Sequence, residues 1–174
     1  MNDNKVFYGI MGLLVAGVIG FLVLAPKPEA LERVGSEQEN QGRKHLEQGE
    51  SVAYDDALPP TSGSHGAPIG WGDYPTPVPE ENVVHDLEHG GIYISYNPDL
   101  VSEEDLQQLR GLFFKPYSNS AFAPTKVVMA PRPENEAAIV FSSWDRNQLF
   151  DSFNKEDMTA YYKTNVNKSP ELAG

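Results

Sequence analysis

Residues 85–96 read HDLEHGGIYISY, a short polar segment that ends at two glycines and is followed at once by an apolar run. The run at residues 92–96 is rich in β-branched and aromatic side chains, which predicts a strand. The paired glycines indicate the end of any helix before it. In such a helix His85 and His89, four positions apart, would have Cβ atoms about 5–6 Å apart and could chelate one divalent cation.

A helical segment is favoured over a strand by the distribution of apolar side chains around the histidines. Counting about 100° per residue from His85 places His89 near 40°, whereas Val83 and Leu87 fall near 160° and 200°. The apolar side would face a core and the histidine side would face outward. A strand would instead put His85, Leu87 and His89 on one side, which makes no coherent face.

The remainder of the chain predicts a small α+β domain. After the first strand, Ser102 and three acidic residues indicate the start of a helix that continues to about residue 114. Further strands are expected at residues 126–130 and 137–144, and helical segments at residues 149–153 and 156–162. The order β-α-β-β-α predicts a sheet with helices packed on it.

Residues 42–96 are dense in glycine and proline, which predicts a long loop layer around the histidine segment. Trp71 and Tyr74 give this layer aromatic surface to pack. Within it, His65 follows Pro59-Pro60-Thr61-Ser62-Gly63-Ser64, and we expect this segment to fold over the histidine pair. His65 would then bind the same ion.

Residues 6–25 form an uncharged apolar stretch that matches the about 20 helical residues needed to cross a bilayer. It predicts a retained transmembrane helix, because Pro26 stands where a signal peptidase would need to cut. Lys5 before the span favours export of the domain to the extracytoplasmic side of the cell membrane. The expected organisation is an anchor (1–26), a juxtamembrane linker (27–41), an exported α+β domain (42–165) and a C-terminal tail (166–174).

Gly12, Ala16 and Gly20 would form a stripe of small residues on one side of that helix. Such a stripe lets two membrane helices approach closely, so a homodimer or a membrane-complex partner is one interpretation. The other interpretation is that glycine is simply frequent in membrane helices.

Composition limits the chemistry of the chain. The 174 residues carry a formal net charge of −12, which argues against nucleic acid as a partner because phosphates require a basic face. Cysteine is absent, so neither a disulfide nor a thiolate ligand is available. Any metal must be bound by nitrogen, oxygen or methionine sulfur.

Three motifs together resemble one family. They are PPTSGSH at residues 59–65, Val78-Pro79, and VHDLEHGG at residues 84–91 followed by a strand, with GRKH at residues 42–45 upstream. This combination resembles the membrane-anchored DUF3105 proteins over roughly residues 42–145. The resemblance implies an exported, single-anchor domain with a histidine-rich metal site, and it implies no reaction. Asp86 and Ser64 depart from the commoner pattern, and neither change removes a ligand.

The expected metal ligands are His65, His85 and His89, with His45 and Met129 as additional candidates. A thioether is a soft donor, so participation of Met129 would favour copper, whereas imidazoles alone suit copper or zinc equally. Glu88 or Asp86 would accept a hydrogen bond from a ligand imidazole and fix its tautomer.

We therefore expect a membrane-anchored protein that binds a transition metal, copper favoured over zinc, and handles or delivers it without catalysis. One alternative treats His85-x-x-Glu88-His89 as the site of a zinc-dependent hydrolase with Glu88 as general base. Two helical turns before the glycines are short for such a site. A second alternative is a non-catalytic structural subunit of a membrane complex.

Overall fold

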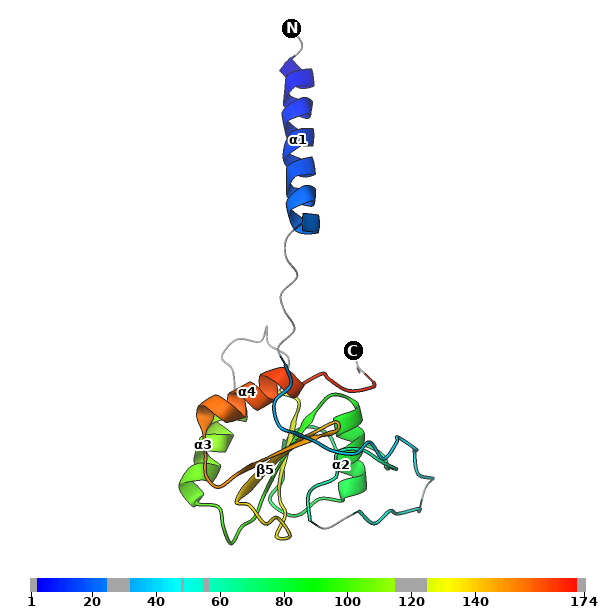
Figure 1. Ribbon diagram of the computed structural model, residues 1–174, viewed down its shortest axis with the longest axis vertical. Helices are drawn as coiled ribbons and strands as arrows, with labels where there is room; N and C mark the ends of the chain where they lie inside the picture. Colours follow the sequence, from blue (N-terminus) through cyan, green and yellow to red (C-terminus); the bar gives the residue numbers. More distant parts are fainter. Residues whose placement is uncertain (1–2, 25–31, 48, 55–56, 115–124, 172–174) are drawn as a thin grey trace. The chain divides into compact units, whose positions relative to one another are not determined.

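A computed structural model describes residues 3–24, 32–47, 49–54, 57–114 and 125–171 (Figure 1). The chain divides into two compact units, residues 1–31 and residues 32–174. The first unit contains helix α1 (Asp3–Leu24) and the second contains a mixed sheet with three helices. Residues 27–31 of the predicted linker lie outside the described residues.

The structure contradicts the predicted transmembrane helix. Side chains of α1 are described for residues 7–21, and no helix in the described part of the chain is long and apolar enough to cross a membrane. The fold class is therefore corrected to a mixed α+β fold, with no helix among the described residues that could span a membrane.

The second unit is built on a six-stranded sheet in the order β1-β6-β5-β3-β4-β2. β3 pairs in parallel with β4, and the central strands β3, β5 and β6 pair antiparallel in that order. Two-residue strands occupy both edges. The strands are β1 (Ser36–Glu37), β2 (Gly72–Asp73), β3 (Ile92–Tyr96), β4 (Val127–Pro131), β5 (Ile139–Ser143) and β6 (Arg146–Phe150).

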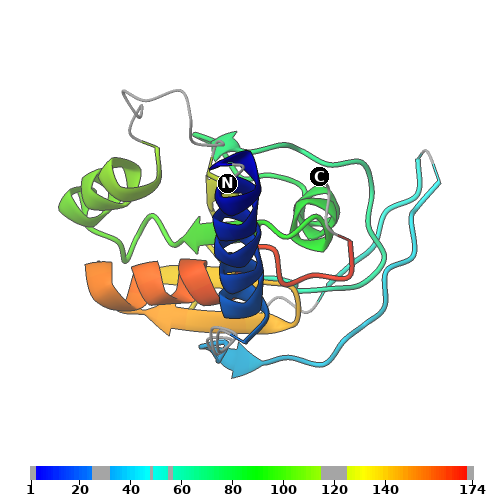
Figure 2. The same cartoon turned by 90° about the horizontal axis from the view of Figure 1, so that it is seen from above.

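Helices cover both faces of this sheet. Alternate residues of a strand point to opposite faces, and on β3 Ile92 and Ile94 join the core beneath α3 (Glu103–Phe113) and α4 (Lys155–Asn165). Tyr93 joins the opposite core with Val83 and Leu87 of α2 (Glu80–Glu88). Figure 1 shows α3 and α4 on one side of β5 and α2 on the other. In Figure 2 the segment after β1 runs outside α2 before it returns.

Most of the predicted elements after residue 90 are confirmed. β3 has the expected bounds, and α3 begins after Ser102, whose hydroxyl accepts a hydrogen bond from the Asp105 amide at 3.0 Å. The predicted helical start at residues 149–153 is wrong, because β6 continues to Phe150. Asp145, at φ 59°, lies in the two-residue turn between β5 and β6, a left-handed conformation that aspartate tolerates. The polar residues of β6 conceal its strand pattern.

Candidate metal centre

Three of the four histidines meet in space. His45, His65 and His85 each present a ring nitrogen, and these three atoms lie within 4.8 Å of one another. Their ring centroids are 4.5–5.1 Å apart and the ring planes cross at 73–74°. Rings that cross this steeply can direct their in-plane lone pairs at one ion. We call this trio the three-histidine cluster.

The three histidines come from three segments that are joined by backbone hydrogen bonds. His45 and His65 form a parallel β-bridge, in which the His65 amide donates to the Lys44 carbonyl at 2.9 Å and the Leu46 amide donates to the His65 carbonyl at 2.8 Å. The Gly66 amide donates to the Glu81 carbonyl of α2 at 3.0 Å. Helix α2 itself supplies His85. The predicted approach of the His65 segment to the histidine pair is thus seen at His85, whereas His89 lies outside the cluster.

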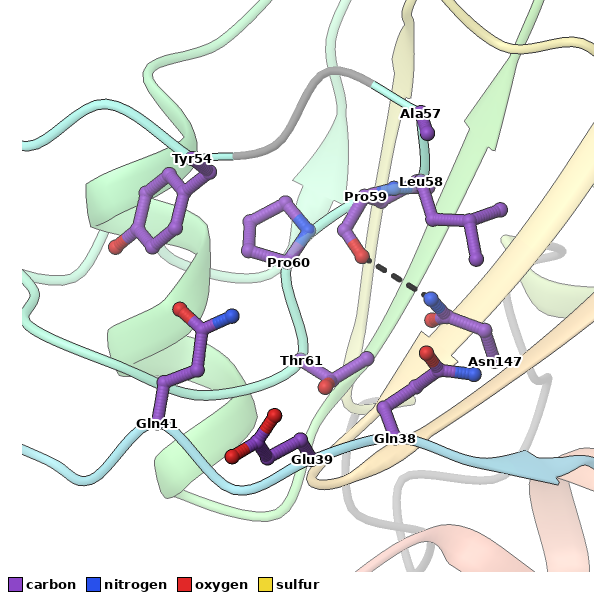
Figure 3. A pocket seen from close by; sticks show the side chains of 10 residues that line it. All are labelled: Gln38, Glu39, Gln41, Tyr54, Ala57, Leu58, Pro59, Pro60, Thr61 and Asn147. Atoms are coloured by element: carbon purple, nitrogen blue, oxygen red, sulfur yellow. Dashed lines mark hydrogen bonds between the residues drawn. The ribbon is translucent and has the colours of Figure 1, made fainter.

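The sheet anchors the segment that precedes His65. The Asn147 side chain on β6 donates to the Pro59 carbonyl at 3.1 Å, and the Asp145 amide donates to the Thr61 carbonyl at 3.2 Å. Figure 3 shows the hydrogen bond between Asn147 and Pro59 beside a pocket of about 170 Å³, which Tyr54 lines on its other side. The Tyr54 hydroxyl donates to the Ser64 carbonyl, and burial raises the pKa of Tyr54, which keeps that hydroxyl protonated.

Backbone carbonyls fix the tautomers of two ring systems. His65 Nδ1 lies 2.9 Å from the Gly63 carbonyl oxygen, and His85 Nδ1 lies 2.6 Å from the Gly66 carbonyl oxygen. A carbonyl oxygen only accepts, so each Nδ1 carries the proton and each Nε2 has a free lone pair when the ring is neutral. Burial lowers the pKa of His65, which favours the neutral ring. This carbonyl contact is the usual support for a metal-binding imidazole.

Glu88 brings a buried carboxylate to the cluster. Its Oε2 atom lies 3.1 Å from His65 Nε2 and 3.8 Å from His45 Nε2. Within the described part of the chain, neither Glu88 oxygen nor His65 Nε2 has a hydrogen-bond partner, although all three atoms are buried. A carboxylate and an unprotonated Nε2 are both acceptors, and a cation between them would satisfy both.

The two acidic candidates, Glu88 and Asp86, have different surroundings. Ligands bound at about 2.0–2.1 Å to one ion lie roughly 3 Å apart, so the 3.1 Å between Glu88 and His65 suits direct ligation. Asp86 accepts instead from the backbone amides of Ile69 at 3.0 Å and Gly70 at 3.2 Å. Burial raises the pKa of Asp86. Asp86 anchors the loop layer, and among the described residues no hydrogen bond joins its carboxylate to a histidine ring.

His89 is not part of the three-histidine cluster. Its ring stacks on that of His85 with centroids 4.9 Å apart and an interplanar angle of 4°. A nitrogen lone pair lies in the plane of its ring, so two parallel stacked rings do not direct their lone pairs to one point. The expected pairing of His85 with His89 is replaced by that of His85 with His45 and His65. His89 lies instead in a second group with Glu88 and Glu171.

Met129 belongs to the core on the face of the sheet opposite to α2. It is fully buried in the core beneath α3 and α4, whereas its neighbour Val128 faces α2. Strand alternation therefore puts the thioether on the opposite face of the sheet from the helix that carries His85.

Sequence reasoning missed two charged residues beside Glu88. Arg43 Nη1 lies 3.9 Å from Glu88 Oε1 and 3.5 Å from Glu171 Oε1. No pattern in the sequence links Glu171 to the histidines, because it reaches them only through the C-terminal segment after α4. Arg43, in contrast, is part of the GRKH motif at residues 42–45, two positions before His45.

Comparison with known proteins gives one match. The family model described as a protein of unknown function (DUF3105) matches residues 45–173. The chain belongs to the DUF3105 family. The matched range begins at His45 and includes every other residue of the centre except Arg43, so the DUF3105 domain contains the whole three-histidine cluster. No curated protein and no solved structure matches the chain.

Proposed function

We propose that this DUF3105 domain binds a transition metal ion through His45, His65 and His85, and that Glu88 is a fourth ligand. The observation that carries the proposal is the buried contact of 3.1 Å between His65 Nε2 and Glu88 Oε2, two acceptor atoms without hydrogen-bond partners among the described residues. Three imidazoles and a carboxylate are a common donor set for borderline divalent ions.

The surroundings of the cluster also favour a cation. The net charge of the chain is −12, which attracts positive ions. His85 and Glu88 lie in the last turn of α2, where the helix dipole places partial negative charge. The Gly63 and Gly66 carbonyls hold the His65 and His85 rings in place, so binding a metal ion requires little reorientation of these two rings.

Copper remains the favoured ion, although Met129 no longer contributes to the argument for it. Met129 lies on the other face of the sheet, so soft donation does not enter the argument. For a fixed set of nitrogen and oxygen donors, affinity among divalent ions is highest for Cu²⁺ and lower for Zn²⁺. We propose Cu²⁺ on this ground.

Unequal exposure of the ligands supports metal handling as the role of the site. The His65 side chain is fully buried, whereas 57% of the His45 side chain is exposed. An ion bound by the buried His65 and Glu88, the half-buried His85 and the exposed His45 can be exchanged from the His45 side. The hydrolase interpretation has less support, because α2 ends at Glu88 and the His89 ring is parallel to that of His85.

Metal analysis of the purified full chain tests the proposal. We expect retained copper after desalting at pH 7.5 from the wild-type protein, and negligible copper in a His65→Gln/His85→Gln variant of unchanged circular dichroism. Because imidazole must be neutral to bind, copper should be released as the pH falls below about 6. Equal copper in both proteins, or retention at pH 4, would contradict the proposal.

A further inference from the structure

Helix α2 and the C-terminal segment form a second group of ligand atoms next to the three-histidine cluster. Oxygen or nitrogen atoms of Glu88, His89 and Glu171 lie within 4.8 Å of one another. The C-terminal segment is held there by a hydrogen bond from the Asn167 amide to the Gly90 carbonyl at 2.9 Å. Gly90, at φ 82°, allows this approach, since a Cβ atom would lie 2.8 Å from Asn167 Cα.

Glu88 belongs to both groups. Its Oε2 atom is the one nearest His65 and His45, and its Oε1 atom is the one nearest Arg43. Both oxygens are buried and neither has a hydrogen-bond partner in the described ranges. One carboxylate can thus ligate an ion in the three-histidine cluster through one oxygen and a neighbouring ion through the other.

The stacked histidines fit two ions better than one. Parallel rings with centroids 4.9 Å apart direct their lone pairs to two points side by side. Paired metal sites hold their ions about 3.5–4 Å apart, which is a similar spacing. In the described part of the chain no hydrogen bond engages either ring nitrogen of His89, so the ring is available as a ligand.

A positive charge already lies near this second group. Arg43 Nη1 is 3.5 Å from Glu171 Oε1 and 3.9 Å from Glu88 Oε1, beyond normal hydrogen-bond length in both cases. The Arg43 side chain is 53% exposed, so it can move into solvent when an ion arrives. A divalent ion would then take the place of the guanidinium charge beside the Glu88 and Glu171 carboxylates.

We infer that Glu88, His89 and Glu171 form a second divalent-cation site, which shares the Glu88 carboxylate with the three-histidine cluster. One imidazole and two carboxylates make a harder donor set than three imidazoles, so this site would take Zn²⁺ or a harder divalent ion. The inference rests on the proposed function of the neighbouring site.

Zinc stoichiometry of the full chain tests this second site. After loading with Zn²⁺ and desalting, we expect two ions per wild-type chain and one per chain in each of two variants, Glu171→Gln and His89→Gln. Glu171 is about half exposed, so its variant should fold normally. Glu136→Gln, which changes an exposed carboxylate between β4 and β5, should retain two ions.

Three results would overturn the inference. One ion in the wild-type chain with no loss in Glu171→Gln and His89→Gln would remove the second site and leave the three-histidine cluster intact. Two ions in the wild-type chain with no loss in either variant, or in only one of them, would mean that the second ion binds elsewhere. No ion in any protein would remove the proposed function together with the second site.

Discussion

Replacing His65 with glutamine is expected to lower the affinity of the domain for Cu²⁺ by about 100-fold or more. Loss of a residue that merely supports a ligand already costs roughly 10- to 100-fold in affinity, and His65 is proposed as a ligand itself. Glutamine fills a similar volume at this fully buried position. Competition titration with a chelator of known affinity measures the change.

His89→Gln is the comparison variant for that experiment, because it removes a proposed ligand of the second site and leaves the three-histidine cluster complete. The His89 ring is parallel to the His85 ring and lies outside the three-histidine cluster, so affinity for the first copper ion should remain within a few-fold of wild type. The opposite ranking, a large loss in His89→Gln and a small loss in His65→Gln, would contradict the proposed ligand set. It would indicate that His85 and His89, four positions apart, chelate the ion together.

Glu88→Gln is expected to change stability and affinity in opposite directions. Without metal, the carboxylate is buried beside an acceptor and has no hydrogen-bond partner among the described residues, a cost that a neutral amide reduces. We expect the metal-free variant to be more stable by about 1–3 kcal/mol, which is the usual cost of an unsatisfied buried group. Copper affinity should fall by roughly 10- to 100-fold.

Urea unfolding in the presence of EDTA, together with copper titration, measures both changes. Glu136→Gln, an exposed carboxylate change, should move neither quantity. Lower stability of metal-free Glu88→Gln with unchanged copper affinity would show that Glu88 is a structural partner of His65 and no ligand.

Local sequence patterns predicted the central elements well. The β-branched run at residues 92–96 and the Ser102 N-cap are signals contained within a few residues, and both gave the observed bounds closely. Strand β6 was not predicted because it contains a buried polar residue, Asn147. The Asn147 side chain donates a hydrogen bond to the Pro59 carbonyl, which is distant in the sequence, and no local pattern indicates this. The two-residue edge strands β1 and β2 depend on their neighbours and have no pattern of their own.

The candidate site was predicted in part, and its errors share one cause. Spacing along α2 correctly put His85 on the side away from Val83 and Leu87, but spacing alone does not fix ring orientation, and the His89 ring is parallel to its neighbour. His45 joins the cluster through a β-bridge to His65, a contact between separate segments. The apolar N-terminal stretch likewise predicted a spanning helix that the described residues do not contain.

The most direct test of the three-histidine cluster is anomalous diffraction from a crystal of the copper-loaded full chain at the copper edge. We predict a peak about 2.0–2.1 Å from the Nε2 atoms of His65 and His85, with a His45 ring nitrogen at a similar distance. A copper peak bound by His85 and His89 without His65, or no peak near these residues, would contradict the account.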